Sequence, residues 1–421
     1  MWIIEHNILL ASMTIIFGLL MAGAVGANDV ANAMGTSVGS KVLSIRQAII
    51  IAGIFETLGA LLASGQVSQT LSTGLINVEH FANNTDILAL GMIASLMAAG
   101  SWLLIATKYG WPVSTTHSIV GAIIGFSSLG IGVSQVNWAM VRDITLTWLF
   151  TPVIAAVLAF LLFYWVQQSI LSAENPTKAA IKIIPYYMFL SSIVLIWVTL
   201  AKGLAPLGLS LSSNKIYFYS VLISIISSLL GRLWLISFLR KSEKFKNPFK
   251  GVEQSFGVLV VFTACAMAFA HGSNDTANAI GPMATIFSLI KNNGQLVIHS
   301  HLPFWIVALG TSGVVAGLAL FGYKVIATVG SKITELTPSR GFAAQLATAA
   351  TVVICSGLGL PVSTTQILIG ALLGVGFARG IGAINLHVIR SIFMSWLITL
   401  PAGALLSIVF YKLLIKIIFV I

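Results

Sequence analysis

The chain contains Gly26-Ala27-Asn28-Asp29-Val30-Ala31-Asn32-Ala33 and, 246 residues further on, the similar stretch Gly272-Ser273-Asn274-Asp275-Thr276-Ala277-Asn278-Ala279. A second pair of stretches lies downstream of these two and is offset by 249 residues: Pro112-Val113-Ser114-Thr115-Thr116 and Pro361-Val362-Ser363-Thr364-Thr365. Two different motifs that recur in the same order at nearly one offset indicate an internal duplication.

The composition places this duplicated chain in a membrane. Of its 421 residues, 57% are hydrophobic and only 8% are charged, whereas soluble domains are about one-quarter charged. Apolar runs of the roughly 20 residues that a spanning helix needs recur in about twelve blocks. The first block leads into a polar motif rather than a cleavage site, so we interpret it as a transmembrane segment and not as a signal peptide.

Charged loops predict the orientation of these blocks. The most basic loop, residues 240–250, is expected in the cytoplasm, and the loop at 67–86, which has acidic residues but no Lys or Arg, outside. The basic residues lie in short loops at helix ends, so the net charge of +11 indicates membrane anchoring and not nucleic-acid binding. Counting outward from the basic loop puts both termini outside the cell.

We therefore expect an all-α polytopic membrane protein with about twelve transmembrane segments in two inverted repeats, an arrangement that is common in secondary transporters. Residues 1–165 form the first repeat, 166–254 the connecting helices and the basic cytoplasmic loop, and 255–421 the second repeat. Gly and Pro near the motifs predict interrupted helices, although tight packing also explains the Gly residues. The blocks that start near Val113 and Val362 are either full crossings or re-entrant hairpins.

The two Asp residues carry the chemistry of the first motif. A carboxylate at the centre of a membrane helix costs roughly 3 kcal/mol, so Asp29 and Asp275 need compensation. Either they are protonated in a buried network, or they bind a cation such as Na⁺ together with amide and backbone oxygens. The Asn residues in each motif are four apart and share a helical face. The candidate Na⁺ ligands are Asn28, Asp29, Asn32, Asn274, Asp275 and Asn278.

The Ser-Thr-Thr runs predict an anion site. Each follows a Pro, a residue suited to the first position of a helix, so hydroxyls and unpaired amides would gather at a helix N-terminus, which attracts phosphate. Alternatively, the hydroxyls hydrogen-bond within their own helices. The candidate phosphate ligands are Asn28, Ser114, Thr115, Thr116, Asn274, Ser363, Thr364 and Thr365. Because a dianion beside two carboxylates is strongly repelled, it binds only when cations bind too, which predicts coupled transport.

At these residues the sequence resembles the inorganic phosphate transporter family, the sodium or proton phosphate symporters. The similarity extends through Gly26–Ser40, Phe55-Glu56-Thr57, Ala270–Pro282 and Gly341–Gly370. It implies import of inorganic phosphate by inverted halves, with the residues above as the binding sites and with Glu56 as a further residue associated with transport. It also implies no cofactor other than the coupling ion.

Departures from the family pattern bear on that ion. Gln366 stands where many relatives have His, although the first half keeps His117, and Gln345 stands where animal members carry Glu. Asn28, where proton-coupled bacterial members have His, favours Na⁺, with coupling to H⁺ or transport of a metal-phosphate complex as the alternatives. We expect a homodimer in the cell membrane, which is the inner membrane in a Gram-negative bacterium.

Three other functions fit parts of the sequence. Two intramembrane Asp residues could form an aspartyl protease, but catalysis would not require a duplicated set of Asn, Ser and Thr, so we expect no enzyme. Carbonyl and hydroxyl groups can also line a channel. Sulfate or arsenate could replace phosphate.

Overall fold

A computed structural model describes residues 2–76, 81, 84–202, 211–242, 248–295, 297, 302–323, 325–326, 336–380 and 386–419. This part of the chain is helical and contains no strand beyond one isolated bridge between Ile76 and Val136. The expected all-α class is confirmed. In chain order the longer helices are α2 (Asn7–Gly39), α3 (Ile45–Ala63), α5 (Thr85–Lys108), α6 (Thr115–Gly130), α7 (Trp138–Val166), α8 (Pro176–Lys202), α9 (Ser213–Ser242), α10 (Pro248–Asn274), α11 (Ala277–Lys291), α12 (Phe304–Phe321), α14 (Pro338–Gly357), α15 (Thr364–Arg379) and α16 (Leu386–Phe419).

Short elements complete the described chain. Helix α1 (Trp2–Glu5) precedes α2, and α4 (Gly65–Gln69) continues into the π-helix η1 (Thr70–Gly74). A 3₁₀ turn, η3 (Val133–Gln135), precedes α7, and a second π-helix, η4 (Gln167–Leu171), follows it.

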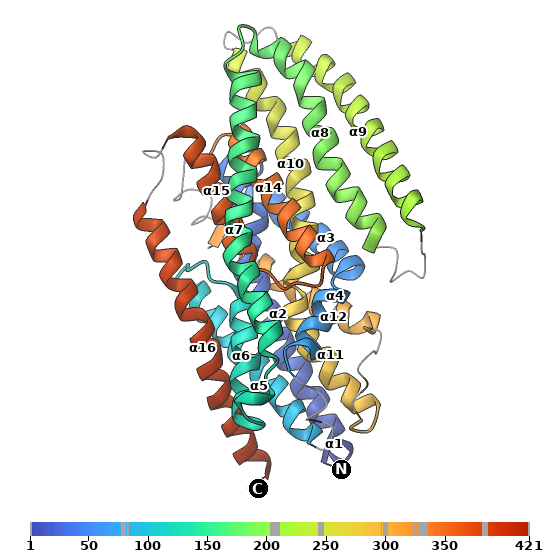
Figure 1. The fold of residues 1–421 in the computed structure, drawn as a ribbon, viewed down its shortest axis with the longest axis vertical. Coiled ribbons are helices and arrows are strands. Elements are labelled where there is room, and N and C mark those ends of the chain that lie inside the picture. The colour runs from blue at the N-terminus through green and yellow to red at the C-terminus, as the bar shows by residue number, and fades with distance from the viewer. Residues whose placement is uncertain are drawn as a thin grey trace.

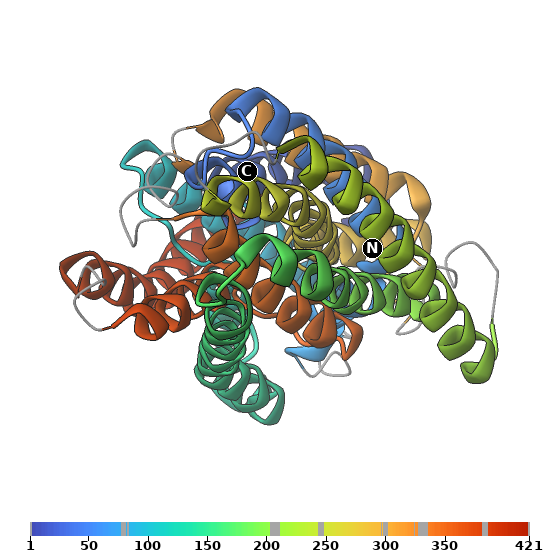
Figure 2. The same ribbon diagram turned by 90° about the horizontal axis from the view of Figure 1, so that it is seen from above.

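Nine spans in the described residues are long and apolar enough to cross a membrane, so the protein is a multi-pass membrane protein. Helix α9 lies at the periphery beside α8 (Figure 2) and exposes large apolar side chains such as Leu230 and Leu233, as a lipid-facing helix does. The total of about twelve segments stays a prediction.

Helices α6 and α15 are shorter than a membrane span. Each has 16 residues, which is about 24 Å against a hydrocarbon core of about 30 Å. Each packs against the preceding helix, α5 or α14, to form a hairpin. The α5–α6 hairpin lies in the lower half of the molecule and the α14–α15 hairpin in the upper half (Figure 1). This favours the re-entrant interpretation and agrees with the inverted arrangement, which stays a prediction.

Each of the following helix contacts between the two halves has an equivalent contact in which the halves exchange roles. Helix α2 packs on α12 and α10 on α3, and likewise α6 packs on α16 and α15 on α7. At the first two contacts a glycine allows the approach: a Cβ at Gly26 would lie 1.9 Å from the Val314 carbonyl oxygen, and one at Gly272 would lie 2.1 Å from that of Glu56. The halves are thus packed into one another. The predicted domain boundaries are not tested by these contacts.

Candidate functional site

The two Asn-Asp motifs differ in backbone structure. Helix α2 runs unbroken through Asn28, Asp29 and Asn32, so the expected interruption is absent there. In the second half α10 ends at Asn274 and α11 begins at Ala277. In this break the Asn278 N–H donates to the carbonyl of Asp275, three residues back, at 3.1 Å. The prediction of interrupted helices is therefore correct for the second motif and wrong for the first, where Gly26 serves close helix packing instead.

Both Ser-Thr-Thr runs begin a helix, as predicted. Ser114 is the N-cap of α6, and its hydroxyl accepts from the His117 N–H at 3.1 Å. Ser363 caps α15 in the same way, accepting from the Gln366 N–H at 3.3 Å. The Pro of each run precedes the N-cap by two residues rather than occupying the first helical position, because Ser is the stronger N-cap residue. Apart from these two capped groups, the N–H groups of the first helical turns have no partner inside their own helices.

The motifs of one half bond to the motifs of the other. The Asn32 amide donates to the hydroxyls of Thr364 and Thr365 at 3.1 and 2.8 Å. The equivalent Asn278 amide donates to Thr115 and Thr116 at 3.1 and 3.4 Å. The sequence separates the bonded residues by 332 and 333 positions in one case and by 163 and 162 in the other. The fold nevertheless places all four polar stretches at one centre.

The two helix starts also bond directly to each other. Thr116 Oγ1 donates to the Val362 carbonyl at 2.9 Å, and Thr365 Oγ1 donates to the Val113 carbonyl at 3.2 Å. The second Thr of each run is thus hydrogen-bonded to the residue that precedes the N-cap of the other helix. The N-termini of α6 and α15 are therefore next to each other, which concentrates their dipoles at one place.

The first Asn of each motif forms hydrogen bonds with the segment that precedes α6 or α15. The Asn28 amide donates to Thr107 Oγ1 and to the Trp111 carbonyl, both at 3.1 Å. In the other half Asn274 lies beside Ser356; in the orientation that satisfies its amide, it accepts from the Ser356 hydroxyl at 3.0 Å and donates to Asp275 at 3.1 Å. The nitrogen of Asn28 and the whole amide of Asn274 are thus engaged by protein groups.

His271 was not predicted as a site residue. Its Nε2 lies 2.9 Å from Asp275 Oδ2 and its Nδ1 lies 3.0 Å from Glu56 Oε1, and all three side chains are fully buried. The imidazole ring of His271 therefore lies between the two carboxyl groups, in short contact with both. The spacing could have revealed it, because His271 precedes Asp275 by four residues and so shares its face of the helix.

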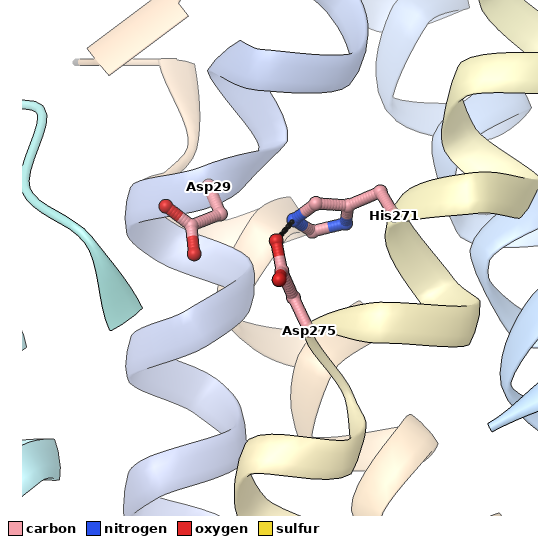
Figure 3. A group of neighbouring side chains, drawn as sticks. All are labelled: Asp29, His271 and Asp275. Atoms are coloured by element: carbon pink, nitrogen blue, oxygen red, sulfur yellow. Dashed lines mark ion pairs between the residues drawn. The ribbon is translucent and has the colours of Figure 1, made fainter. Parts of the chain in front are cut away.

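Asp29, His271 and Asp275 form the centre of the site. Asp29 lies on α2, next to the His271–Asp275 pair of the second half (Figure 3). One potential ligand atom from each lies within 4.8 Å of the others, close enough to surround a single metal ion. The Asp275 carboxylate also accepts from Thr364 Oγ1 at 2.5 Å. Asp29 accepts from Asn32 at 3.2 Å and has Thr115 as a side-chain neighbour.

Several buried oxygens at this centre have no hydrogen-bond partner among the described residues: Asn28 Oδ1, Asp29 Oδ2 and Asn278 Oδ1. An unpaired buried acceptor is costly unless a ligand satisfies it. Carboxylate and carbonyl oxygens are ligands for hard cations, while the neighbouring helix N-termini and hydroxyls suit an anion. The site therefore combines the groups needed to bind ions of both signs.

All twelve predicted ligand residues are buried, with at most 2% of each residue exposed, and hydrogen bonds connect them across the two halves. Glu56 joins them through His271. Gln366, which departs from the family pattern, occupies in α15 the place that His117 has in α6, and each has its backbone N–H bonded to the N-cap Ser.

A multi-pass helical fold with a buried polar centre, built at two short helix starts and one helix break, is an arrangement typical of membrane transporters. The model of the phosphate transporter family matches residues 25–407, and this chain belongs to that family. A homologue from Haemophilus influenzae, named a putative phosphate permease, is 51% identical over 97% of this chain and 98% of its own length. The chloroplastic inorganic phosphate transporter 2-1 of Arabidopsis thaliana is 40% identical over 96% of this chain and 72% of its own.

A solved structure shows the same fold. The chain is similar to a protein described as "The sodium-dependent phosphate transporter", with a TM-score of 0.91, 36% sequence identity, and coverage of 97% of this chain and 99% of that one. The family and these relatives are transporters and not enzymes, so the alternative of an intramembrane protease is set aside.

Proposed function

We propose that this protein imports inorganic phosphate across the cell membrane by symport with Na⁺. The observation that carries the proposal is the reciprocal bonding of Asn32 to Thr364 and Thr365 and of Asn278 to Thr115 and Thr116. It joins the predicted cation ligands of each half to the predicted anion ligands of the other. An ion bound at one site therefore changes the contacts of the other site directly.

The roles divide as follows. The first-turn amides and hydroxyls of α6 and α15 bind phosphate, through Ser114, Thr115 and Thr116 and through Ser363, Thr364 and Thr365. Asp29 and Asp275, with the oxygens of Asn28, Asn32 and Asn278, bind Na⁺. Asn274 and Glu56 hold this centre in place through Ser356 and His271.

The negative charge of the centre explains why phosphate and the cation must bind together. The centre contains Asp29 and Asp275, with Glu56 behind His271, and at a low effective dielectric a phosphate dianion would be strongly repelled by carboxylates a few ångströms away. Bound Na⁺ removes that repulsion, so phosphate and cation each raise the affinity for the other. Na⁺ is favoured over H⁺ by the unpartnered oxygens described above and by the similarity to a transporter described as sodium-dependent.

Uptake by the purified protein in liposomes tests this function. We expect an inward Na⁺ gradient to drive accumulation of radiolabelled phosphate above equilibrium, and an inward H⁺ gradient in Na⁺-free buffer to drive none. Accumulation with H⁺ alone would replace Na⁺ by H⁺ as the coupling ion. Equilibration without accumulation would indicate a channel, and no phosphate flux under either gradient would overturn the proposal.

A further inference from the structure

A pocket of about 420 Å³ lies at the end of the molecule where α2 ends and α10 and α14 begin. Its polar lining consists of Ser40, Lys41, Lys250, Glu253 and Gln254, and the rest of the lining is apolar. This is the end at which α9 ends and α10 begins (Figure 1), and the basic residues of 240–250 predict that it is cytoplasmic. The pocket is separate from the central cluster and is not among the sites considered so far.

The charge of the pocket favours anions. Lys41 and Lys250 are both exposed at its rim, and Lys41 has a positive φ of 59° in the tight turn that ends α2. The acidic side chain, Glu253, is already engaged: its two oxygens accept from the backbone N–H and the hydroxyl of Ser339, at 2.9 and 2.8 Å. Glu253 therefore neutralises the start of α14, while the two ammonium groups give the pocket its positive charge.

Polar side chains on α2 connect the pocket to the central cluster. Asn32, Thr36 and Ser40 are four residues apart and follow one face of the helix, and Ser40 lines the pocket. Thr36 is fully buried, and its hydroxyl has no partner among the described residues. A buried hydroxyl without a partner, halfway along this face, can bond to a polar ligand that passes it.

Gln345 of α14 lies beside this face, on the neighbouring row of α2 that holds Ala33 and Ser37. Its amide nitrogen donates to the Ala33 carbonyl at 2.7 Å and lies 3.2 Å from Ser37 Oγ, and its oxygen accepts from Thr263 of α10 at 3.0 Å. The amide thus links α2, α10 and α14. All these bonds involve neutral groups, which can exchange for bonds to a passing ion at a small net cost.

On the basis of the proposed function, we propose that the pocket is the cytoplasmic vestibule for phosphate, in which Lys41 and Lys250 bind the anion weakly as it leaves the central cluster. The vestibule is a second, low-affinity phosphate site on the path that runs along Thr36 and Ser40. Its lysines concentrate the anion at the cytoplasmic mouth, as clefts of one charge do for their ligands.

The test measures phosphate affinity separately on the two faces. The double variant Lys41→Gln/Lys250→Gln is expressed in a bacterial host without its own phosphate carriers. Uptake by whole cells gives the KM at the outer face, and uptake by inside-out membrane vesicles gives the KM at the cytoplasmic face. We expect the cytoplasmic KM to rise on the order of tenfold, the low end of the effect of charge-lined clefts, while the outer KM stays unchanged.

The matched control is Lys178→Gln/Lys182→Gln, which removes two exposed lysines near the start of α8, outside the pocket. It loses the same charge and is expected to change neither KM. Three results would each overturn the proposed vestibule. They are an equal rise of the cytoplasmic KM in the control, an unchanged cytoplasmic KM in the pocket variant, and a rise of the KM at the outer face in the pocket variant. Failure of the proposed function is distinguishable, because the unaltered protein would then take up no phosphate in either preparation.

Discussion

The two Asn-Asp motifs have nearly the same sequence but different surroundings. Asp29 lies in a continuous helix, and its Oδ2 has no hydrogen-bond partner among the described residues. Asp275 lies at a helix break and is held by His271 and Thr364. The duplication therefore preserves which residues pair across the halves, while the two carboxylates differ in how firmly the protein holds them. Asp29 is the one more open to an incoming cation.

The sharpest test of this difference replaces each carboxylate by an amide. We expect Asp29→Asn to lower Na⁺-driven phosphate uptake by at least roughly a hundredfold, about 2.7 kcal/mol, because the amide cannot neutralise a cation. Its thermal stability in detergent should be unchanged, since Asn32 can still bond to Thr364 and Thr365. Asp275→Asn should lower both uptake and melting temperature.

Both quantities are measured on the same purified preparations, by liposome uptake and by a thermal-shift assay. Unchanged cation dependence in both variants would count against the carboxylates as cation ligands. Equal losses of stability would show that the two positions are equivalent and remove the distinction.

His271 gives a second test of the difference between the two motifs, because the first half has no equivalent contact among the described residues. We expect His271→Gln to reduce uptake on the order of tenfold, since Glu56 and Asp275 lose the ring between them. Removing Glu56 as well should restore part of the loss, because no unpaired carboxylate then remains at that position. The double variant Glu56→Gln/His271→Gln should therefore be less impaired than the two single effects predict, by about 0.5–3 kcal/mol, the range for residues in contact.

A full double-mutant cycle for stability and uptake measures this coupling. Strict additivity would show that the two side chains act independently. That result would leave the short contacts without an energetic role.

The close helix contacts test what the two halves share. Gly26→Ala and Gly272→Ala should each destabilise the protein by about 1–3 kcal/mol, since the new Cβ would meet a backbone carbonyl at 1.9 or 2.1 Å. Gly23→Ala is the control on the same helix, because its Cβ would lie 3.7 Å from the nearest atom. Melting temperatures of the three variants give the result. If Gly23→Ala is as damaging as Gly26→Ala, intrinsic helix effects and not close packing explain the losses.

Much of this arrangement could be predicted from the sequence. The repeated motifs indicated that their residues belong to one site, and the Ser-Thr-Thr runs indicated helix starts, because these features depend on local residue types. The pairing of Asn32 with Thr364 and of Asn278 with Thr115 could not be assigned, because contacts between residues 332 and 163 positions apart depend on how the halves pack.

Other features were missed for physical reasons. Glycine allows both a broken helix and a close contact, so Gly26 could not reveal that α2 continues unbroken. His271 shares a helical face with Asp275, but its contact with Glu56 of α3 depends on how α3 packs on α10 and could not be predicted from the sequence. The roles of Asn28 and Asn274 in holding turns depend on Thr107 and Ser356, which lie outside both motifs.

The smallest expected effects concern the helix caps, which are the most similar parts of the two halves. Ser114→Ala and Ser363→Ala each remove an N-cap bond and should cost about 1 kcal/mol of stability. Ser127→Ala is the control, because the Ser127 hydroxyl bonds only to carbonyls of its own helix within the described structure, at 2.6 and 3.2 Å. Melting temperatures should fall equally for the two caps and remain unchanged for the control.

Replacing the caps by Asp separates helix capping from phosphate binding. Asp is as good an N-cap residue as Ser, so Ser114→Asp and Ser363→Asp should retain the stability that Ala loses. The added carboxylate would, however, stand at the helix end proposed to bind the anion, and it should raise the KM for phosphate severalfold through repulsion. A variant that is stable but binds phosphate poorly would place the anion at these N-termini. If phosphate affinity instead follows stability in all four variants, the serines serve only as caps and the anion binds elsewhere.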